Sequence, residues 1–390
     1  MGDLMKKIYV ITNVKNESDI IESFCRYNLN YCDGILIYEG NKSTDCTRDI
    51  INKLVGEGLP VFFADEVEVE RYVAAKNAIA ELAFSKYEAD LVIPLDADEF
   101  LSHIDGNNPR EVLESLRGDV EYRILWRTYV YEKEPDITQG FMPNNFTHFR
   151  NPALDIRGKT LASRFLIKEM KAQFSPGAHD LEYTGDQHAP ANVEIHPKLV
   201  LSHFPLRSKA QLLNKVVPNW ICKWREPFPM REGHGIQLGV IWDELKEKGD
   251  ISQEKIKQYS IEYSVSDYSL TEIMPKIADH LMINGQMDTA FCQSSLQLQY
   301  TDYRDTSKTL MRAMLTEAEL TLAALPKREQ ETIKLIEKER SYIDELTRKN
   351  NSLKQQLDEN SKIVSDMYSS KSWRIGNRLV KIMRFFIPGR

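Results

Sequence analysis

Residues 91–101 read LVIPLDADEFL, an apolar run of strand length that leads directly into an acidic segment. Carboxylates at the end of a buried strand are unfavourable unless cations neutralise them. If the segment is extended, Asp96 and Asp98 lie two residues apart and project from the same side. Such a pair suits a hard divalent ion, Mg²⁺ or Mn²⁺, whose remaining positions take water and phosphate oxygens. The stretch therefore predicts a metal site at the end of a strand.

The chain before this stretch alternates between strand and helix patterns. Strands are expected at residues 8–12, 34–38, 60–63 and 91–95, and helices at 19–30, 44–55 and 71–84. Strands separated by helices of this length indicate parallel pairing with right-handed crossovers. A ligand of such an α/β sheet binds at the carboxyl ends of the strands, where the strand order switches. Further on, we expect short strands at 122–126, 165–168 and 199–203 and mainly helices from 208 to 325.

Composition narrows the class of protein. The chain has 390 residues, more than one ordinary domain of about 100–200 residues requires. With 51 basic and 58 acidic side chains the net charge is −7, which argues against nucleic acid as a partner. The five cysteines are scattered without C-x-x-C spacing, and no apolar run has the length of a signal peptide or a membrane span. These features predict a reduced, cytoplasmic protein.

Residues 327–368 contain no glycine or proline, and nine basic side chains balance nine acidic ones. One heptad position repeats at Ile336, Ile343, Asn350, Leu357 and Val364, and Leu346, Leu353 and Met367 occupy the other seam position. A buried asparagine in such a seam fixes the register of a parallel pair. The pattern predicts a coiled coil that joins two copies of the chain; the alternative is a single solvated helix that folds back on the rest of the protein.

The last 22 residues, 369–390, carry six positive charges and no acid. Apolar side chains recur at helical spacing, and Trp373 stands near the start of the segment; the apolar positions are Ile375, Leu379, Ile382, Met383 and Phe386. A basic amphipathic helix of this kind lies in the interface of an anionic membrane. We therefore expect peripheral attachment to the cytoplasmic face of a membrane, the alternative being docking on the protein itself or on a partner.

Several motifs together resemble a known family. They are NVKNE (13–17), KSTDCT (42–47), RYVAAKNAIAELA (71–83), DADEF (96–100) and LSHFPLRS (201–208). The chain is similar to GT-A glycosyltransferases of the family 2 type, in particular to the branch with N-x-x-N-E and D-A-D-E-F motifs. The resemblance covers residues 7–105 well and 106–215 loosely. This chain departs from the family at Gly40 and Asn41, where family members carry acids, and at Cys46, where they carry glycine. These departures leave open which nucleobase the sugar donor carries.

The resemblance implies an organisation and a set of roles. Residues 1–208 would form a Rossmann-like GT-A nucleotide-sugar-binding domain with a mostly parallel sheet, followed by a helical region (209–325), the coiled coil (326–368) and the membrane-binding tail (369–390). The nucleotide sugar would contact Asn13, Asn16, Glu17, Asp45, Arg71, Lys76 and Asp96. A Mn²⁺ or Mg²⁺ ion would be held by Asp96, Asp98 and His203.

An inverting transferase also needs a base that takes the proton of the acceptor hydroxyl. The loop at residues 175–188 offers Asp180 and Glu182, and His179 and His188 would serve as bases or bind the acceptor. Asp180 is the preferred base, because Gly177 and Ala178 just before it permit close approach of a substrate. Glu99 is the second choice, and a retaining mechanism stays open.

The sequence thus predicts a metal-dependent glycosyltransferase. Its donor would be a UDP, GDP or TDP sugar, and its acceptor a glycan or lipid-linked glycan of bacterial cell-surface polysaccharide (O-antigen or capsule type). Two alternatives remain. A sugar nucleotidyltransferase normally has a glycine-rich phosphate loop near its N-terminus, whereas here no glycine follows the first strand until Gly34. A non-catalytic scaffold at the membrane would explain the C-terminal third but not the acidic motif.

Overall fold

The computed structural model describes residues 5–39, 43–67, 74–136, 141–183, 192–223 and 250–264, together with residues 345–366 and short pieces elsewhere; side chains of 217–223 are not among them. The short pieces are 241, 244–245, 247–248, 282–283, 286–287, 314, 334, 338, 340–342, 369–370, 373 and 375–378. The chain divides into two compact units, Met1–Thr321 and Leu322–Arg390. Arg71 and His188 lie outside the described residues.

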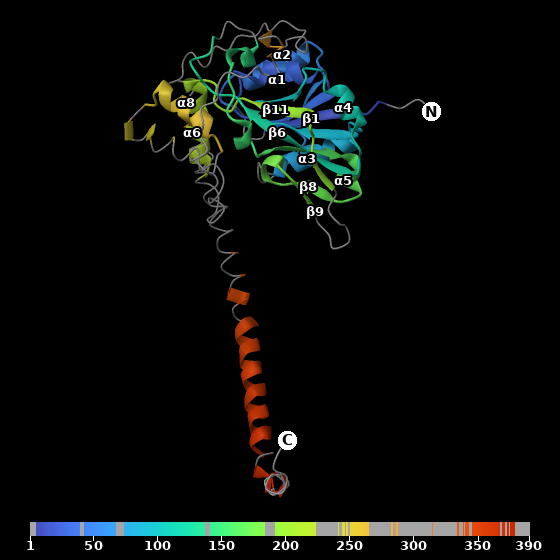
Figure 1. The fold of residues 1–390 in the computed structure, drawn as a ribbon, viewed down its shortest axis with the longest axis vertical. Helices are drawn as coiled ribbons and strands as arrows, with labels where there is room; N and C mark the ends of the chain where they lie inside the picture. The colour runs from blue at the N-terminus through green and yellow to red at the C-terminus, as the bar shows by residue number, and fades with distance from the viewer. Residues whose placement is uncertain are drawn as a thin grey trace, which may run out of the picture. The chain divides into compact units, whose positions relative to one another are not determined.

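A nine-stranded sheet forms the centre of the first unit (Figure 1). Its order is β3-β2-β1-β4-β7-β6-β11-β5, and β10 pairs with β6. The strands are β1 (Ile8–Asn13), β2 (Gly34–Tyr38), β3 (Val61–Phe63), β4 (Leu91–Pro94), β5 (Glu99–His103), β6 (Val120–Thr128), β7 (Gly158–Ser163), β10 (Asn192–Ile195) and β11 (Leu199–His203). The strands β1 to β4 are mutually parallel, while β7 runs antiparallel to β4 and to β6, and β5 antiparallel to β11. The predicted α/β sheet is confirmed in its first half and continues as a mixed sheet.

Helices cover both faces of the first half of the sheet. On one face lie α1 (Ile21–Asn28) and α2 (Thr47–Gly56), and on the other lies α3 (Ala75–Ser85), as Figure 1 shows. Neighbouring residues of β1 point to opposite faces, so Val10 joins the core under α1 and α2 while Ile11 joins the core under α3. This three-layer arrangement follows from strands that are apolar on both sides.

The second half contains short elements that hold the site. Besides α4 (Arg110–Ser115), these are the 3-10 turns η2 (Met142–Asn145), η3 (Pro152–Leu154) and η4 (Pro176–Ala178), and the hairpin of β8 (Ala172–Phe174) and β9 (Leu181–Tyr183). The strand predicted at residues 165–168 is wrong: α5 (Arg164–Lys168) is a helix. Its start is fixed because the Ser163 side chain accepts the Leu166 N–H, which is the usual way to cap a helix.

The helical region is described in part and contains α6 (Lys209–Lys223) and α8 (Gln253–Glu262), with the short pair β12 (Met282–Ile283) and β13 (Gln286–Met287). Side chains of α6 and α8 share a separate core with the strand-end residue Tyr131; it consists of Tyr131, Leu206, Leu212, Val216, Ile241, Ile251 and Ile256. The helical region therefore packs directly on the end of β6 within the first unit.

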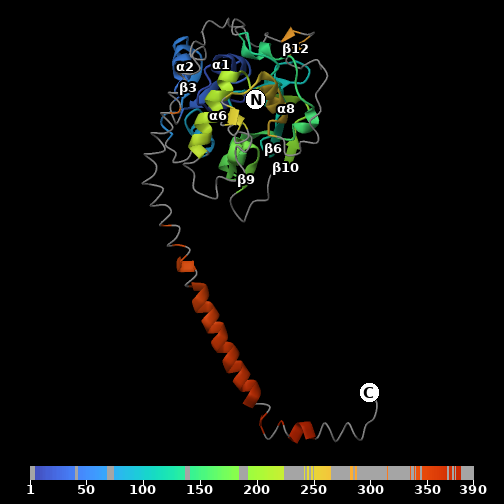
Figure 2. The same ribbon diagram turned by 90° about the vertical axis from the view of Figure 1, so that its left-hand side faces the viewer.

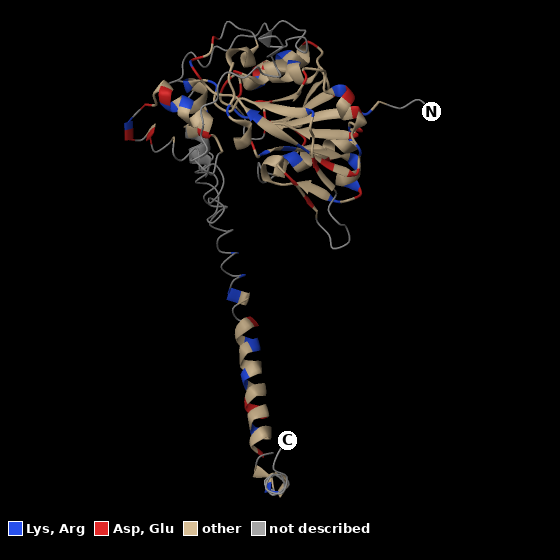
Figure 3. Cartoon of the chain, in the orientation of Figure 1, with Lys and Arg blue, Asp and Glu red and all other residues tan. Residues whose placement is uncertain are grey.

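In the second unit, residues 345–366 form a continuous helix (Figure 2). It carries both basic and acidic side chains (Figure 3), and Leu346, Leu353 and Leu357 are 48%, 56% and 65% exposed. The helix predicted here is confirmed over these residues, and its pairing with a second copy stays a prediction. Among the described residues, no helix is both long and apolar enough to cross a membrane.

Candidate active site

The acidic motif lies at the point where the strand order switches. From β1 the chain continues to β2 and β3 on one side, and β4 adds to the other side of β1. Residues 95–98 join β4 to β5, and β5 pairs not with β4 but with β11. The motif therefore occupies a corner of the sheet beside the carboxyl end of β1, where ligands of open α/β sheets bind.

Within this corner the backbone turns rather than staying extended. The Glu99 N–H donates to the Asp96 carbonyl at 3.0 Å, and the Asp96 N–H donates to Glu99 Oε2 at 2.8 Å. The two aspartates consequently meet different basic groups, which corrects the expectation of an extended segment with both carboxylates on one side. The turn is tight because the buried Glu99 carboxylate accepts the backbone N–H of Asp96.

Asp96 is held between two lysines. Lys76 of α3 donates to Asp96 Oδ1 and Lys159 of β7 donates to Asp96 Oδ2, both at 2.6 Å. Burial alone would raise the pKa of Asp96, but Lys159 and Lys76 outweigh it and hold that pKa well below its ordinary value. The Lys159 side chain is only 1% exposed and also lies 3.6 Å from Glu99 Oε2. Asp96 thus stays ionised and fixes both ammonium groups in the corner.

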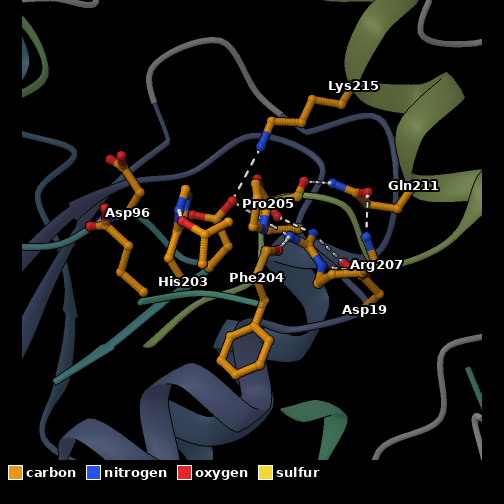
Figure 4. Close-up of polar contacts among 12 residues, drawn as sticks. Asp19, Asp96, His203, Phe204, Pro205, Arg207, Gln211 and Lys215 are labelled. Carbon is orange, nitrogen blue, oxygen red and sulfur yellow. Dashed lines mark hydrogen bonds and ion pairs between the residues drawn. The ribbon is translucent and has the colours of Figure 1, made fainter. Parts of the chain in front are cut away.

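Asp98 contacts a different lysine, Lys215 of α6, whose side chain extends into the corner (Figure 4). Its Oδ2 accepts from Lys215 Nζ at 3.2 Å and lies 3.7 Å from the Arg207 guanidinium. The Asp98 carbonyl accepts the N–H of Phe204 at 2.9 Å, which ties the motif to the end of β11. Burial opposes ionisation, but the positive charges of Lys215 and Arg207 outweigh it and lower the pKa of Asp98. Both motif aspartates are therefore carboxylates at neutral pH.

Arg207 connects the LSHFPLRS segment to the turn after β1. Its guanidinium is fully buried and donates to both oxygens of Asp19, at 2.7 and 2.8 Å, and to Glu17 Oε2 (Figure 4). Burial raises the pKa of Glu17 to about 7 although Arg207 and Lys215 oppose this. The predicted nucleotide contact Glu17 is therefore part of a buried ion cluster together with Asp98.

His203 stacks on Trp126, with ring centroids 4.5 Å apart, and the Trp126 N–H donates to Glu99 Oε1 at 2.6 Å. The Thr128 hydroxyl donates its proton to Asp155, so its oxygen accepts from His203 Nδ1, 3.3 Å away. This places the proton of the neutral ring on Nδ1 and leaves the lone pair on Nε2. Burial lowers the pKa of His203 to about 3, so the ring is neutral at physiological pH.

The predicted metal ligands fit a divalent ion in part. Among the described residues, no three His, Cys, Asp or Glu side chains gather closely enough to hold a metal. Asp96 does not fit, because both of its oxygens accept from ammonium groups. Asp98 and His203 do fit: the Asp98 carbonyl accepts the N–H of Phe204, the residue after His203, and the carboxylate is ionised while the His203 ring presents its Nε2 lone pair. Ions of the Mg²⁺ type commonly take one or two protein ligands and complete their shell with phosphate and water.

Two predicted nucleotide contacts have structural roles. Asn16, at φ +56°, accepts the Thr44 N–H at 2.7 Å. Asp45 accepts the N–H of Ser18 at 3.1 Å and both the N–H and the hydroxyl of Thr47. These bonds fasten the turn after β1 to the turn after β2, so the carboxylate of Asp45 is already engaged. Asn13 ends β1 at the switch point, as the sequence predicts.

The four candidate bases differ in their surroundings. Asp180 forms an ion pair with Arg123 at 2.7 Å, and Glu182 is exposed on β9. Glu99 is fully buried, and its two oxygens accept from Trp126 and from the Asp96 N–H. The ring of His179 lies edge-on to Trp126, with centroids 5.4 Å apart. His179 thus contacts Trp126, the same indole on which His203 stacks.

Sequence reasoning assigned no role to Lys159, Arg207, Lys215, Trp126 or Tyr263, although all of them line this corner. Tyr263 lies edge-on to His203 at 5.4 Å and contributes to the raised pKa of Lys215, which Asp98 raises most. Arg207 belongs to the LSHFPLRS motif (201–208), and a positive charge within this largely apolar segment indicates a buried acidic partner. The other four come from distant parts of the chain, and nothing in their local sequence distinguishes them.

Comparisons with known proteins add little. No protein-family model and no curated protein sequence matches the chain. Among solved structures, S. aureus TarS 1–349 in complex with UDP is 11% identical over 81% of this chain and 92% of its own, with a TM-score of 0.30. Glucosyl-3-phosphoglycerate synthase from Mycobacterium tuberculosis, in complex with Mn²⁺, UDP and glucosyl-3-phosphoglycerate, is 18% identical over 45% of this chain and 62% of its own, with a TM-score of 0.27. A putative glucose-1-phosphate thymidylyltransferase from Bacillus anthracis is 11% identical over 49% of this chain and 87% of its own, with a TM-score of 0.27. Likenesses this weak carry no argument about function.

Proposed function

We propose that the chain is a glycosyltransferase that uses a nucleotide-sugar donor and a divalent ion. The proposal rests on one observation: a carboxylate (Asp98), an imidazole with a free Nε2 lone pair (His203) and a set of buried cations meet at the switch point of an α/β sheet. Asp98 and His203 would hold a Mn²⁺ or Mg²⁺ ion. When bound there, the ion neutralises the negative charge that develops on a departing diphosphate.

The chain's own cations suit the same leaving group. Lys215 extends from α6 into the corner (Figure 4), where its ammonium lies 3.2 Å from Asp98 Oδ2. Lys76 and Lys159 are already held in place by Asp96, so their charges are preorganised rather than recruited at the moment of reaction. In this proposal Asp96 positions two lysines, and the Arg207 cluster fixes the turn after β1 beside them.

The proposed acceptor is a glycan or a lipid-linked glycan. The reaction would take place at the cytoplasmic face of a membrane, during assembly of a bacterial cell-surface polysaccharide, and would invert the configuration at the anomeric carbon of the sugar. The motif resemblance supports the reaction class. The basic amphipathic pattern of residues 369–390 supports a membrane partner, and the heptads of 326–368 support a homodimer.

Calorimetric titration tests the donor site. UDP and GDP are titrated into the purified protein with and without Mn²⁺, and TDP and CMP follow if neither binds. We expect binding to one nucleotide that requires Mn²⁺. Asp98→Asn should weaken it by at least the roughly 10–100-fold that loss of an outer-shell metal partner costs.

The matched control is Asp119→Asn, which removes the same charge from an exposed pair with Arg117 and should leave binding unchanged. If no nucleotide binds under any metal condition, the transferase proposal fails and the scaffold alternative takes its place. Equal affinities for wild type and Asp98→Asn would instead remove Asp98 from the site.

Two truncations test the partners. Removal of residues 369–390 should abolish co-sedimentation with anionic phosphatidylglycerol vesicles and leave the dimer intact, because the basic charges are lost and the heptads are kept. Removal of 326–390 should in addition reduce the mass measured by light scattering from two chains to one. A full-length chain that is monomeric at micromolar concentration would refute the coiled-coil dimer.

A further inference from the structure

The hairpin tip between β8 and β9 is fastened against β7 at several points. Lys159 Nζ donates to the Gly177 carbonyl at 2.8 Å, and the Thr160 hydroxyl donates to the His179 carbonyl at 2.8 Å. The Asn77 side chain of α3 both donates to and accepts from the backbone of Phe174. The tip is thus held rigidly beside Asp96, since the same Lys159 ammonium binds the Asp96 carboxylate.

These contacts fix the ring of His179 in one orientation and one tautomer. His179 Nδ1 lies 2.6 Å from the Gly158 carbonyl oxygen. A carbonyl can only accept, so Nδ1 carries the proton, and in the neutral ring the lone pair is on Nε2. His179 therefore presents an acceptor nitrogen on the opposite side of the ring from its anchor, the arrangement that a general base requires.

The space next to this nitrogen is left open by a glycine. A Cβ added at Gly177 would stand 2.7 Å from His179 Nε2, and Gly177 has φ +80°, a conformation that disfavours any side chain. Gly177 is itself exposed. A hydroxyl group that approaches over Gly177 thus reaches Nε2 without meeting a side chain at that position. The sequence-based argument for close approach at Gly177 holds, but it applies to His179 rather than to Asp180.

We infer that His179 Nε2 is the general base that takes the proton of the acceptor hydroxyl, an assignment that rests on the proposed glycosyl transfer. In that step the hydroxyl oxygen bonds to the anomeric carbon of the donor sugar, and its proton passes to Nε2. The bond between that carbon and the diphosphate oxygen breaks, and the nucleoside diphosphate leaves with the electron pair. One indole, Trp126, separates the base from His203 on the metal side.

The charges around the ring favour its neutral form. Burial lowers the pKa of His179 below 6.5, and Lys159 and Arg157 lower it further, while the hydrogen bond to Gly158 and the Asp96 carboxylate oppose the shift. A base with a lowered pKa is unprotonated at neutral pH and is ready to accept a proton. Activity should therefore rise with pH through an apparent pKa below 6.5 and level off above it.

His179→Asn tests the assignment, because the asparagine amide can keep the donor to the Gly158 carbonyl while Nε2 is lost. The probes are UDP-glucose, UDP-N-acetylglucosamine, GDP-mannose and TDP-glucose, with water or octyl β-glucoside as acceptor, and the readout is released nucleoside diphosphate. We expect kcat to fall by about 10²–10⁴-fold, the acid limb of the pH profile to disappear, and the affinity for the nucleoside diphosphate to stay unchanged. Gly177→Ala, which fills the space at Nε2, should lower release in the same assay.

His196→Asn is the matched control, because His196 lies beyond β10 and its Nδ1 accepts the Lys198 N–H instead of anchoring to a carbonyl. His196→Asn should release diphosphate at the wild-type rate. A His179→Asn protein that releases diphosphate at the wild-type rate with the wild-type acid limb would overturn the base. If wild type binds a nucleotide but releases none from any probe, or binds none at all, the proposed transfer itself fails, and the base with it.

Discussion

Replacement of Arg207 by methionine should lower the free energy of unfolding by about 3–5 kcal/mol, the usual cost of removing one partner from a buried ion pair. The guanidinium is fully buried and donates to Asp19, Glu17 and the Phe204 carbonyl. Without it, the carboxylates remain in a site that has lost its main positive charge. The measurement is equilibrium denaturation in urea, followed by circular dichroism.

The loss should grow as the pH rises. The pKa of Glu17 is raised to about 7 from 4.5, so the stability linked to this group is full below pH 4.5 and declines as the pH passes 7. Arg207 limits that rise, so its removal raises the pKa of Glu17 further and makes the ionised carboxylate costlier above neutrality. Arg117→Met is the control: Arg117 and Asp119 are 62% and 55% exposed, and their pair is worth at most about 1 kcal/mol. Equal effects of the two substitutions would contradict the buried-cluster argument.

Gly158→Ala should have an effect of similar size for a different reason. Gly158 opens β7 and pairs with Leu125 of β6, and a Cβ there would lie 1.8 Å from the Ile124 carbonyl oxygen and 2.8 Å from Leu125 Cα. Those atoms belong to the backbone of the neighbouring strand, so no side-chain rotation relieves the clash. We expect a loss of about 3 kcal/mol or more, at the upper end of overpacking penalties. Thermal unfolding monitored by circular dichroism gives the value.

The control for this substitution is Gly118→Ala. There the nearest atoms to an added Cβ are at 3.9 and 4.0 Å, in ordinary contact, and the stability should change by no more than about 0.5 kcal/mol. A Gly158→Ala protein that unfolds at the wild-type temperature would show that β6 and β7 can move apart at this point without loss of stability. Because the Gly158 carbonyl also anchors His179, any partly folded Gly158→Ala protein should lose activity as well.

The first half of the fold was predictable because its signals are local. Apolar runs of strand length and helical periodicity gave β1 to β4 and α1 to α3 near their observed bounds. The acidic motif was equally readable, since three acids directly after a buried strand need neutralisation. The error at α5 came from a short apolar segment, Arg164–Lys168, that suits a strand or a helix equally well and was decided by the Ser163 cap.

The site itself was only half predictable. Lys159 and Lys215 meet Asp96 and Asp98 because β7 adds next to β4 and because α6 packs over the end of β11. Neither placement follows from local sequence, since both depend on the strand order of the mixed half of the sheet. The ion pair of Asp180 with Arg123 was likewise not predictable from local sequence, because Arg123 lies on β6, far from Asp180 along the chain.

One buried arginine has consequences for how this protein can evolve. Arg150 binds Asp155, which accepts the Thr128 hydroxyl next to His203, and it also donates to the carbonyls of Ile261 and Tyr263 at the C-terminal end of α8. A recombination event that exchanged the chain after residue 208 for an unrelated partner would remove these two acceptors and disturb the histidine from behind. The helical region therefore contributes to the orientation of His203, and the sheet and this region depend on each other for it.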